Sequence, residues 1–308
     1  MRSIYRFFFW FFSSFPRRKE WFLAVSAVIF FTSSVNAEEV KKPNFHHVHL
    51  NVVDPAATIS YYRKFHGATP VRYANTVDAL FTERSFILMN KVDMPAPSAQ
   101  KTGLWHIGWG GRDVPSEYEW FKKNGADINT HLYALNNIHV TYLNGPDKEM
   151  IEVNTMGHNR FGHVHLLAAD VNVTTGWYAK HFGLAPRNPN VPKPEDMTKV
   201  RAWSSGFRCD NVSFVVYGLP DYTPRPPWWK DGPLTEQVST KGRVIDHIAF
   251  SYRDIEPEFE RLKKEGVTIV GQIRFDEEFN HSSFFVEGPD KVLIEVVEAK
   301  RVPEGIWE

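Results

Sequence analysis

A fourfold internal repeat is the feature of this sequence that most restricts its fold. The stretch FHHVHLNVVDPAATISYYRKFHG (residues 45–67) matches FGHVHLLAADVNVTTGWYAKHFG (161–183). A second pair, LWHIGWGGRDVPSEYEWFKKNG (104–125) and IDHIAFSYRDIEPEFERLKKEG (245–266), shares His-Ile, Arg-Asp, Lys-Lys and a final Gly. Self-similarity of this kind indicates that one supersecondary unit recurs along the chain.

Each repeat predicts the same order of elements. A short apolar run, typical of a strand, leads to an aspartate that can cap a helix: Asp54, Asp113, Asp170 and Asp254. A glycine suited to left-handed backbone angles ends each helix: Gly67, Gly125, Gly183 and Gly266. Further strand-like runs follow, and the Gly-Pro-Asp-Lys segments at 145–148 and 288–291 read as hairpin turns. The sequence therefore predicts an α+β fold of four βαβββ modules.

A single βαβββ module leaves one face of its sheet uncovered, so the modules are expected to pair. We expect modules 1 and 2 to form a first domain (38–157) and modules 3 and 4 a second domain (158–300). An insertion at 218–242 is rich in proline, which predicts a loop rather than a helix.

The N-terminal region differs from the rest of the chain. Basic residues precede an apolar run at 22–31, and small residues follow at 35–37, which is the order of a secretory signal peptide. A run of about ten apolar residues is shorter than the roughly 20 needed to span a bilayer. We therefore expect residues 1–37 to direct export, with no stable membrane insertion after their removal; an uncleaved anchor is the alternative.

The bulk composition narrows the possible partners. The formal net charge is zero, which argues against a nucleic-acid-binding surface and favours small molecules as ligands. Cys209 is the only cysteine, so an intrachain disulfide and a cysteine-based zinc site are both excluded. The sequence indicates no oligomeric state.

The histidines of the repeat are candidate metal ligands. Successive side chains of a strand point to opposite faces, so His47 and His49 share one face, as do His163 and His165. Inward-facing imidazoles beside a carboxylate suit a divalent metal. A lone histidine on a strand is more often a hydrogen-bonded core residue, but the recurrence in both halves favours at least one metal site.

These motifs resemble the vicinal oxygen chelate superfamily, which includes glyoxalase I, extradiol dioxygenases, methylmalonyl-CoA epimerase and antibiotic-resistance proteins. The resemblance covers nearly all of residues 45–298 and rests on GHVHL, DHIAF, GPDKVLIEV and their first-half counterparts. In that family two βαβββ modules form a cup of sheet that binds a divalent metal. The resemblance implies two ligand sets, one in each half: His47, His106 and Glu152, then His163, His247 and Glu295.

The resemblance also bears on the chemistry. In the glyoxalase and epimerase branches a fourth ligand comes from a strand whose counterparts here carry Leu88 and Val216, which cannot ligate. Two histidines and one carboxylate are typical of non-haem Fe(II) oxygenases. We therefore expect an extradiol-type dioxygenase with Fe(II), although Mn(II) or Zn(II) could occupy the same ligands. A glyoxalase-type lyase or isomerase and a non-catalytic binding protein, as in bleomycin resistance, are the alternatives.

The second histidine of each repeated motif has two possible roles. His49 and His165 would lie about 7 Å along the strand from the ligands, where a neutral imidazole can act as a general base. They could equally hydrogen-bond the wall of the cup. Small residues, Gly108 and Ala249, stand at the equivalent positions of modules 2 and 4 and would leave space opposite.

Four aromatic residues are candidate substrate contacts. Tyr142 stands at the offset where extradiol enzymes carry a tyrosine, whereas the second half has Phe285 there. The insertion contains Tyr222, Trp228 and Trp229, and we expect it to cover a second-half active site as a lid. Its alternative role is packing between the two domains.

Overall fold

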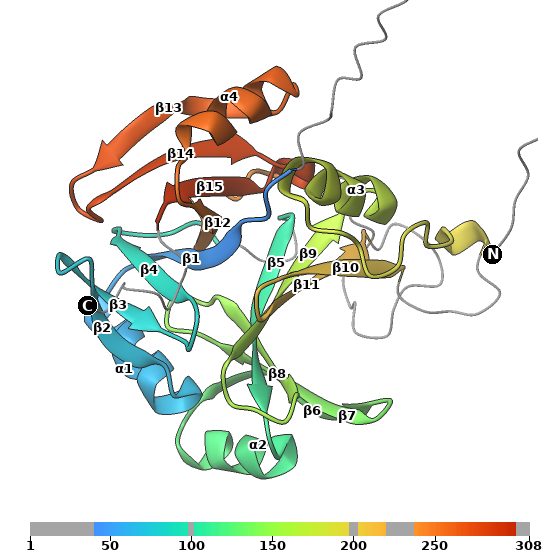
Figure 1. Cartoon of the computed structure of the whole chain (residues 1–308). Coiled ribbons are helices and arrows are strands. Elements are labelled where there is room, and N and C mark those ends of the chain that lie inside the picture. Colours follow the sequence, from blue (N-terminus) through green and yellow to red (C-terminus); the bar gives the residue numbers. More distant parts are fainter. Residues whose placement is uncertain (1–39, 98–101, 197–202, 220–236, 300–308) are drawn as a thin grey trace, which may run out of the picture. The chain divides into compact units, whose positions relative to one another are not determined.

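The computed structural model (Figure 1) contains four modules in the predicted order, but the third has one strand fewer after its helix than predicted in the residues that the structure describes. It describes residues 40–97, 102–196, 203–219 and 237–299. The predicted α+β class is confirmed, with two sheets and four α-helices in the described part of the chain. No helix in these ranges is long and apolar enough to cross a membrane.

The elements follow the repeat. Module 1 comprises β1 (Asn44–Val52), α1 (Pro55–His66), β2 (Thr69–Tyr73), β3 (Val77–Phe81) and β4 (Phe86–Lys91). Module 2 comprises β5 (Leu104–Gly111), α2 (Val114–Lys123), β6 (Asp127–Leu135), β7 (Ile138–Asn144) and β8 (Met150–Thr155). Module 3 comprises β9 (Phe161–Ala168), α3 (Val171–Phe182), the 3-10 helix η2 (Pro194–Asp196), β10 (Ser204–Cys209) and β11 (Val212–Gly218). Module 4 comprises β12 (Ile245–Tyr252), α4 (Glu256–Lys264), β13 (Thr268–Asp276), β14 (His281–Glu287), the 3-10 helix η3 (Pro289–Lys291) and β15 (Leu293–Glu298).

Local chemistry sets the helix ends. The Asp54 carboxylate accepts hydrogen bonds from the backbone N–H groups of Ala56 and Ala57, and Asp170 caps α3 in the same way. Gly67 and Gly183 end α1 and α3 with φ of 65° and 64°, which costs glycine little. The fourth expected cap is wrong: among the described contacts, α4 has Ile255 at its cap and no side-chain hydrogen bond there.

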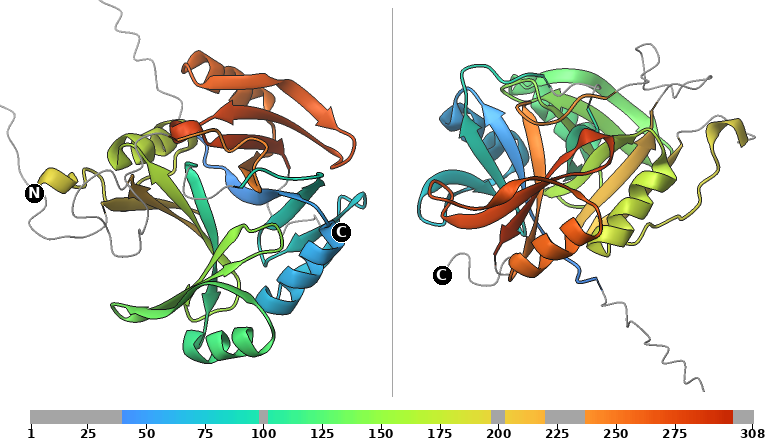
Figure 2. Two further views of the ribbon diagram at one scale, coloured as in Figure 1. Left: turned by 180° about the vertical axis from the view of Figure 1, so that it is seen from behind. Right: turned by 90° about the horizontal axis from the view of Figure 1, so that it is seen from above.

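The predicted pairing of neighbouring modules is wrong. Modules 1 and 4 form an eight-stranded sheet in the order β13-β14-β15-β12-β1-β4-β3-β2. Modules 2 and 3 form a seven-stranded sheet in the order β10-β11-β9-β5-β8-β7-β6. The first strands of the paired modules run antiparallel, β1 beside β12 and β5 beside β9. In Figures 1 and 2 the blue strand β1 accordingly lies beside the orange-red strands of module 4, and neither sheet belongs to one half of the sequence.

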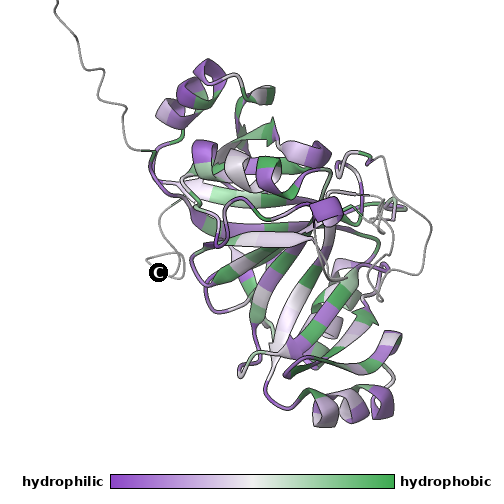
Figure 3. Ribbon diagram, turned by 90° about the vertical axis from the view of Figure 1, so that its right-hand side faces the viewer, coloured by the Kyte–Doolittle hydropathy of each residue, from purple (hydrophilic) through white to green (hydrophobic). Residues whose placement is uncertain are grey.

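The core lies between the two sheets. Hydrophobic and hydrophilic residues alternate along the strands (Figure 3), and Val48, Ile107, Val164 and Ile248 of the four central strands belong to one buried apolar cluster. The Phe45 ring lies with its centroid 5.9 Å from that of Phe161 in the other sheet. Burying each such ring stabilises the fold by about 1.5–3 kcal/mol. The opposite face of each sheet is thereby left to the histidines.

Candidate metal centres

Two clusters of histidine and carboxylate side chains lie on the faces of the sheets away from the core. We define the first cup by its residues on the eight-stranded sheet: His47, His49, His247, His281 and Glu295. We define the second cup by its residues on the seven-stranded sheet: His106, His163, His165 and Glu152. Each of these side chains is at least nine-tenths buried.

In the first cup, three side chains from three strands converge. Nε2 of His47 on β1 and Nε2 of His247 on β12 each lie 3.2 Å from the same oxygen, Oε2, of Glu295 on β15. Because β1 and β12 are antiparallel and β12 and β15 are parallel neighbours, the three side chains emerge on one face. Two imidazoles and one carboxylate at these distances could hold a divalent metal.

Outer hydrogen bonds orient both imidazoles of the first cup. Nδ1 of His247 lies 2.6 Å from the Asp246 carboxylate, which also accepts a hydrogen bond of 2.9 Å from the Asn51 amide. Nδ1 of His47 lies 2.7 Å from Nδ1 of His46. Partners of this kind fix a ligand's tautomer and leave its Nε2 facing the site.

A further histidine, His281 on β14, contacts the carboxylate of the first cup. Its Nε2 lies 3.4 Å from Oε1 of Glu295, and its Nδ1 lies 2.8 Å from the Tyr73 hydroxyl. Sequence analysis missed Asp246, His46 and His281. Asp246 and His46 could have been found, because each directly precedes a predicted ligand; no spacing signal marked His281.

The electrostatics of the first cup follow from burial and partner number. Burial opposes ionisation of Glu295, but the imidazoles of His247, His281 and His47 outweigh it and hold the pKa of Glu295 well below its usual value. Burial would lower the pKa of His247, yet the carboxylates of Asp246 and Glu295 together raise it to about 9. His47 shares only Glu295, and burial lowers the pKa of His47 to about 3.

The second cup repeats the arrangement with different supports. Nε2 of His106 on β5 lies 3.1 Å from Oε2 of Glu152 on β8, and Nε2 of His163 on β9 lies 3.5 Å from Oε1. The Tyr142 hydroxyl donates to Oε2 of Glu152 at 2.8 Å, and the Asn154 amide donates to Oε1 at 2.6 Å. Tyr142 therefore contacts the carboxylate; whether it also contacts a substrate stays a prediction.

The structure groups the six predicted ligands differently from the sequence prediction. All six predicted residues lie in the two cups, but His47 joins His247 and Glu295, whereas His163 joins His106 and Glu152. The grouping by sequence halves is wrong because β1 pairs with β12 and β5 with β9.

The second histidine of each motif lies closer to the ligands than the expected 7 Å. Ligand nitrogens of His47, His49 and His247 all lie within 4.8 Å of one another. In the second cup, ligand atoms of His106, Glu152, His163 and His165 satisfy the same limit. The predicted small residues do leave space: Ala249 pairs with His47, and Gly108 pairs with His163.

Of the two positions that the sequence marked for a possible fourth ligand, one lies at a cup and the other lies in the core. Leu88 pairs with His49 and lines a cavity at the first cup, as expected. Val216 instead belongs to the core, and its neighbour Val215 pairs with His165. Neither Leu88 nor Val215 carries a ligating atom.

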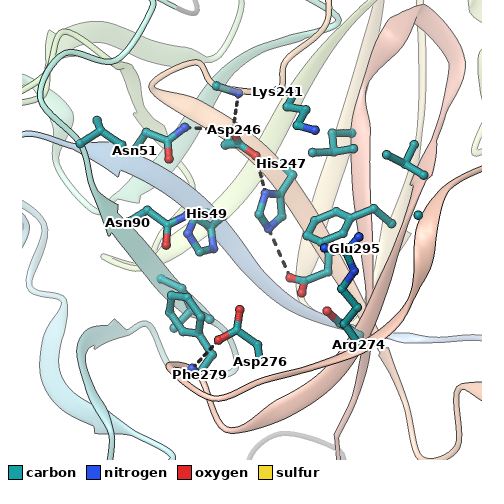
Figure 4. Close-up of a pocket in the computed structure, with 18 of the residues that line it drawn as sticks. His49, Asn51, Asn90, Lys241, Asp246, His247, Arg274, Asp276, Phe279 and Glu295 are labelled. Carbon is teal, nitrogen blue, oxygen red and sulfur yellow. Dashed lines mark hydrogen bonds and ion pairs between the residues drawn. The ribbon is translucent and has the colours of Figure 1, made fainter.

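A cavity of about 580 Å³ opens on the first cup (Figure 4). His49, His247 and Glu295 line it, and Figure 4 shows them around one space with Asp246 behind His247. Lys241 and Arg274 are exposed residues of its lining, whereas Phe279 supplies a buried apolar wall. The predicted lid residues Tyr222, Trp228 and Trp229 lie outside the described residues, as does the predicted signal at 1–37.

Imidazole nitrogen atoms that face the cups fit a divalent cation. Within the described part of the chain, Nε2 of His49 is buried without a hydrogen-bond partner, and Nε2 of His47 and His163 form no hydrogen bond with the glutamate oxygens that lie 3.2 and 3.5 Å away. Buried polar atoms normally have partners, and an imidazole nitrogen is a good ligand for divalent metals.

Comparisons with known proteins identify the family. Residues 160–296 match the model of the Glyoxalase/Bleomycin resistance protein/Dioxygenase superfamily. This part of the chain belongs to that superfamily. Glyoxalase I from Zea mays is 18% identical over 83% of this chain and 92% of its own, with a TM-score of 0.62. A putative dioxygenase from Bacillus subtilis is 12% identical over 86% of this chain and 87% of its own, with a TM-score of 0.57.

The predicted family is thus confirmed for residues 160–296, and the two structural likenesses show that the predicted fold extends over the first half of the chain. No curated protein matches the chain in sequence. Members of this superfamily are often metal-dependent enzymes, and the histidine and glutamate clusters here could hold a metal.

Proposed function

We propose that the chain is a metal-dependent enzyme whose reaction takes place in the first cup. The observation that carries this proposal is the approach of His47 and His247 to one oxygen of Glu295 at the wall of a cavity. Cavities of this size, with a few convergent polar groups, are the usual setting of small-molecule sites. This differs from the sequence expectation, which placed the active site in the second half of the chain.

The reaction we favour is that of an extradiol-type dioxygenase with Fe(II). His47, His247 and Glu295 would hold the ion, and Mn(II) or Zn(II) could replace it. A bound Fe(II) would supply Lewis acidity and positions at which an oxygenated substrate and dioxygen can both bind. Asp246 and His46 would keep the imidazoles in place throughout.

The lining of the cavity supports a small oxygenated substrate with an anionic group. Lys241 and Arg274 can attract and orient a carboxylate or a phenolate, and Phe279 and Phe285 can pack against its apolar part. His49 faces the cavity, and because burial lowers its pKa to about 3 its imidazole is neutral at pH 7. A pKa this low makes His49 a weak base, so it would accept a proton from a substrate hydroxyl that a bound ion has made more acidic.

The same feature of His49 favours a second candidate, a glyoxalase-type lyase or isomerase. Such a reaction moves a proton within the substrate and needs a base beside the metal, but it does not need oxygen. A non-catalytic binding protein is the third possibility, with the cavity serving only to hold a ligand.

Oxygen dependence separates these candidates. The mature protein is loaded anaerobically with Fe(II), Mn(II) or Zn(II), and turnover of catechols and of 2-oxoaldehyde adducts is measured with and without O₂. Oxygen uptake matched to catechol loss, and abolished in His247→Ala, supports the dioxygenase. Turnover without oxygen supports the lyase or isomerase. Ligand binding by metal-free protein, with no turnover under any condition, contradicts an enzyme.

We also propose that the protein is exported and acts on a small molecule, without nucleic-acid partners. The support is the order of basic, apolar and small residues in 1–37 together with zero net charge. Cell fractionation and N-terminal sequencing test the proposal, because cleavage near residue 37 and recovery outside the cytoplasm are expected. A chain recovered uncleaved in the cytoplasm contradicts export.

A further inference from the structure

The second cup differs from the first in how its carboxylate relates to its histidines. Ligand atoms of His106, His163, His165 and Glu152 all lie within 4.8 Å of one another. In the first cup the corresponding group contains three histidines and leaves out the carboxylate of Glu295. A ready set of four close ligand atoms is therefore a property of the second cup.

The carboxylate of the second cup is held in advance. The hydroxyl of Tyr142 occupies Oε2 of Glu152, and the amide of Asn154 occupies Oε1, at 2.8 and 2.6 Å. Oε2 also lies 3.7 Å from Nε2 of His165 and 3.1 Å from Nε2 of His106. Glu152 is thus fixed at the centre of three imidazoles before any ion arrives.

His165 differs from its equivalent in the first cup, His49, in its contact with the carboxylate of its cup. Both rings stack on a histidine of the neighbouring strand, His165 on His106 with centroids 4.1 Å apart and His49 on His247 with centroids 4.5 Å apart. Nε2 of His165, however, lies 3.7 Å from Oε2 of Glu152, whereas the close group of ligand atoms that contains His49 leaves out the glutamate of its cup. His49 instead lines the large cavity. The two repeated histidines therefore face different environments.

We propose that the second cup is a four-ligand metal site that stabilises the fold, with His165 as the fourth ligand beside His106, His163 and Glu152. Four protein ligands fill the sphere of a tetrahedral ion such as Zn(II) and leave no position open for a substrate, which is the pattern of structural zinc sites. The ion would tie β5, β8 and β9 together at the seam between modules 2 and 3. The inference rests on the proposed function only in taking both cups to bind metal.

The test compares matching histidines of the two cups. The full mature chain is stripped of metal and titrated with Zn(II) and with Co(II), and metal per chain, the visible Co(II) spectrum and the thermal midpoint are recorded. Wild type should bind two ions, one of them with the intense Co(II) absorption of a four-coordinate site. His165→Ala should weaken that site at least about tenfold, remove its absorption and lower the midpoint of the loaded protein.

Two controls make the result specific. His49→Ala should leave the intense absorption and the midpoint unchanged. His165→Cys, which still offers a ligand, should keep the metal and add a sulfur-to-cobalt band, and it covers the case in which His165→Ala fails to fold. The inference is wrong if His165→Ala retains the wild-type spectrum and affinity, or if removing metal from the second cup leaves the midpoint unchanged. A wild-type protein that binds no metal contradicts the proposed function itself.

Discussion

The two cups share a scaffold and a ligand set but differ in what surrounds the ligands. Asp246 precedes His247 in the first cup, whereas Trp105 precedes His106 in the second. Likewise His46 precedes the first cup's ligand on β1, whereas Gly162 precedes the second cup's ligand on β9. The first cup thus supports its imidazoles with hydrogen bonds, whereas the second supports its carboxylate.

The carboxylate, by contrast, has more hydrogen-bonding neighbours in the second cup than at the equivalent positions of the first. Tyr142 and Asn154 bond to Glu152, whereas Phe285 and Val297 stand at the equivalent positions around Glu295. Both sheets can present two histidines and a glutamate, so that ligand set alone does not distinguish a reactive site from a structural one. Outer partners and the adjoining cavity make the difference.

The largest effect should come from removing one ligand in each cup. His247→Ala leaves only His47 and Glu295 of the three proposed ligands of the first cup. It should lower turnover by more than about 100-fold, which exceeds the usual effect of losing a hydrogen-bond partner of a ligand. His106→Ala, its counterpart, should leave turnover within a few-fold of wild type. Steady-state kinetics of both variants, with circular dichroism as a folding control, check the pair. Equal losses would erase the distinction between the cups.

Metal uptake should depend on pH in the first cup and little in the second. His247 has a pKa of about 9 in the metal-free protein, so between pH 6 and 8 it carries a proton that a metal must displace. Affinity should therefore rise about tenfold per pH unit up to about pH 9. Burial lowers the pKa values of His106 and His165, so protons compete less with a metal for these two imidazoles. Calorimetric titrations at pH 6, 7 and 8 measure both sites.

The pH effect has its own control. Asp246→Asn removes a carboxylate that raises the pKa of His247, so it should flatten the dependence in the first cup. It should also weaken metal binding there by about 10–100-fold, as loss of an outer partner does. Asp78→Asn, which removes an exposed partner of Arg72, should change neither quantity. An unaltered pH profile in Asp246→Asn would contradict the origin assigned to it.

A smaller effect should follow from filling the space beside His163. A Cβ at Gly108 would lie 1.9 Å from Nε2 of His163, so Gly108→Ala must displace that imidazole. The expected destabilisation is about 1–3 kcal/mol, with loss of metal from the second cup alone. Ala249→Gly, at the matching place in the first cup, should keep both metals. Denaturant unfolding with metal analysis tests this, and a Gly108→Ala protein with two tightly bound ions contradicts it.

The smallest effect should come from the support of the second carboxylate. Tyr142→Phe removes one hydrogen bond to Glu152 and should cost about 1 kcal/mol of unfolding free energy. The control is Tyr133→Phe, because it removes a neighbouring hydroxyl that lacks the 2.8 Å contact with Glu152. Thermal unfolding of both variants measures the difference. A larger loss in Tyr133→Phe would reverse the assignment.

The sequence predicted the modules because each repeat carries its own local signals. Strand alternation placed His47 and His49 on one face, and Asp54 and Gly67 marked the limits of α1. The resemblance to the superfamily implied the six predicted ligands, and strand alternation accounts for their common face, since each lies on a strand whose other face is core.

The pairing of modules could not be read in the same way. Modules 1 and 3 share one type of first strand, and modules 2 and 4 share the other. Pairing 1 with 2 or 1 with 4 joins one strand of each type and offers the same ligands, so the repeat fits both arrangements. Long-range packing decides between them, and contacts such as Asn51 with Asp246 leave no mark in a local pattern.

Modules 2 and 3, which form one sheet, lie in the sequence between modules 1 and 4, which form the other. This order affects folding during synthesis. All strands of the seven-stranded sheet have been made by residue 218, whereas β1 must wait for β12. Asn51 and Asp246 are 195 residues apart, and such distant closures are slow and leave an unpaired edge open in the meantime. During that interval β5, a strand of the type that β1 finally joins, is already available to pair with it. This chain must therefore avoid pairing β1 with β5, whereas in a protein whose consecutive modules pair that contact would be the native one.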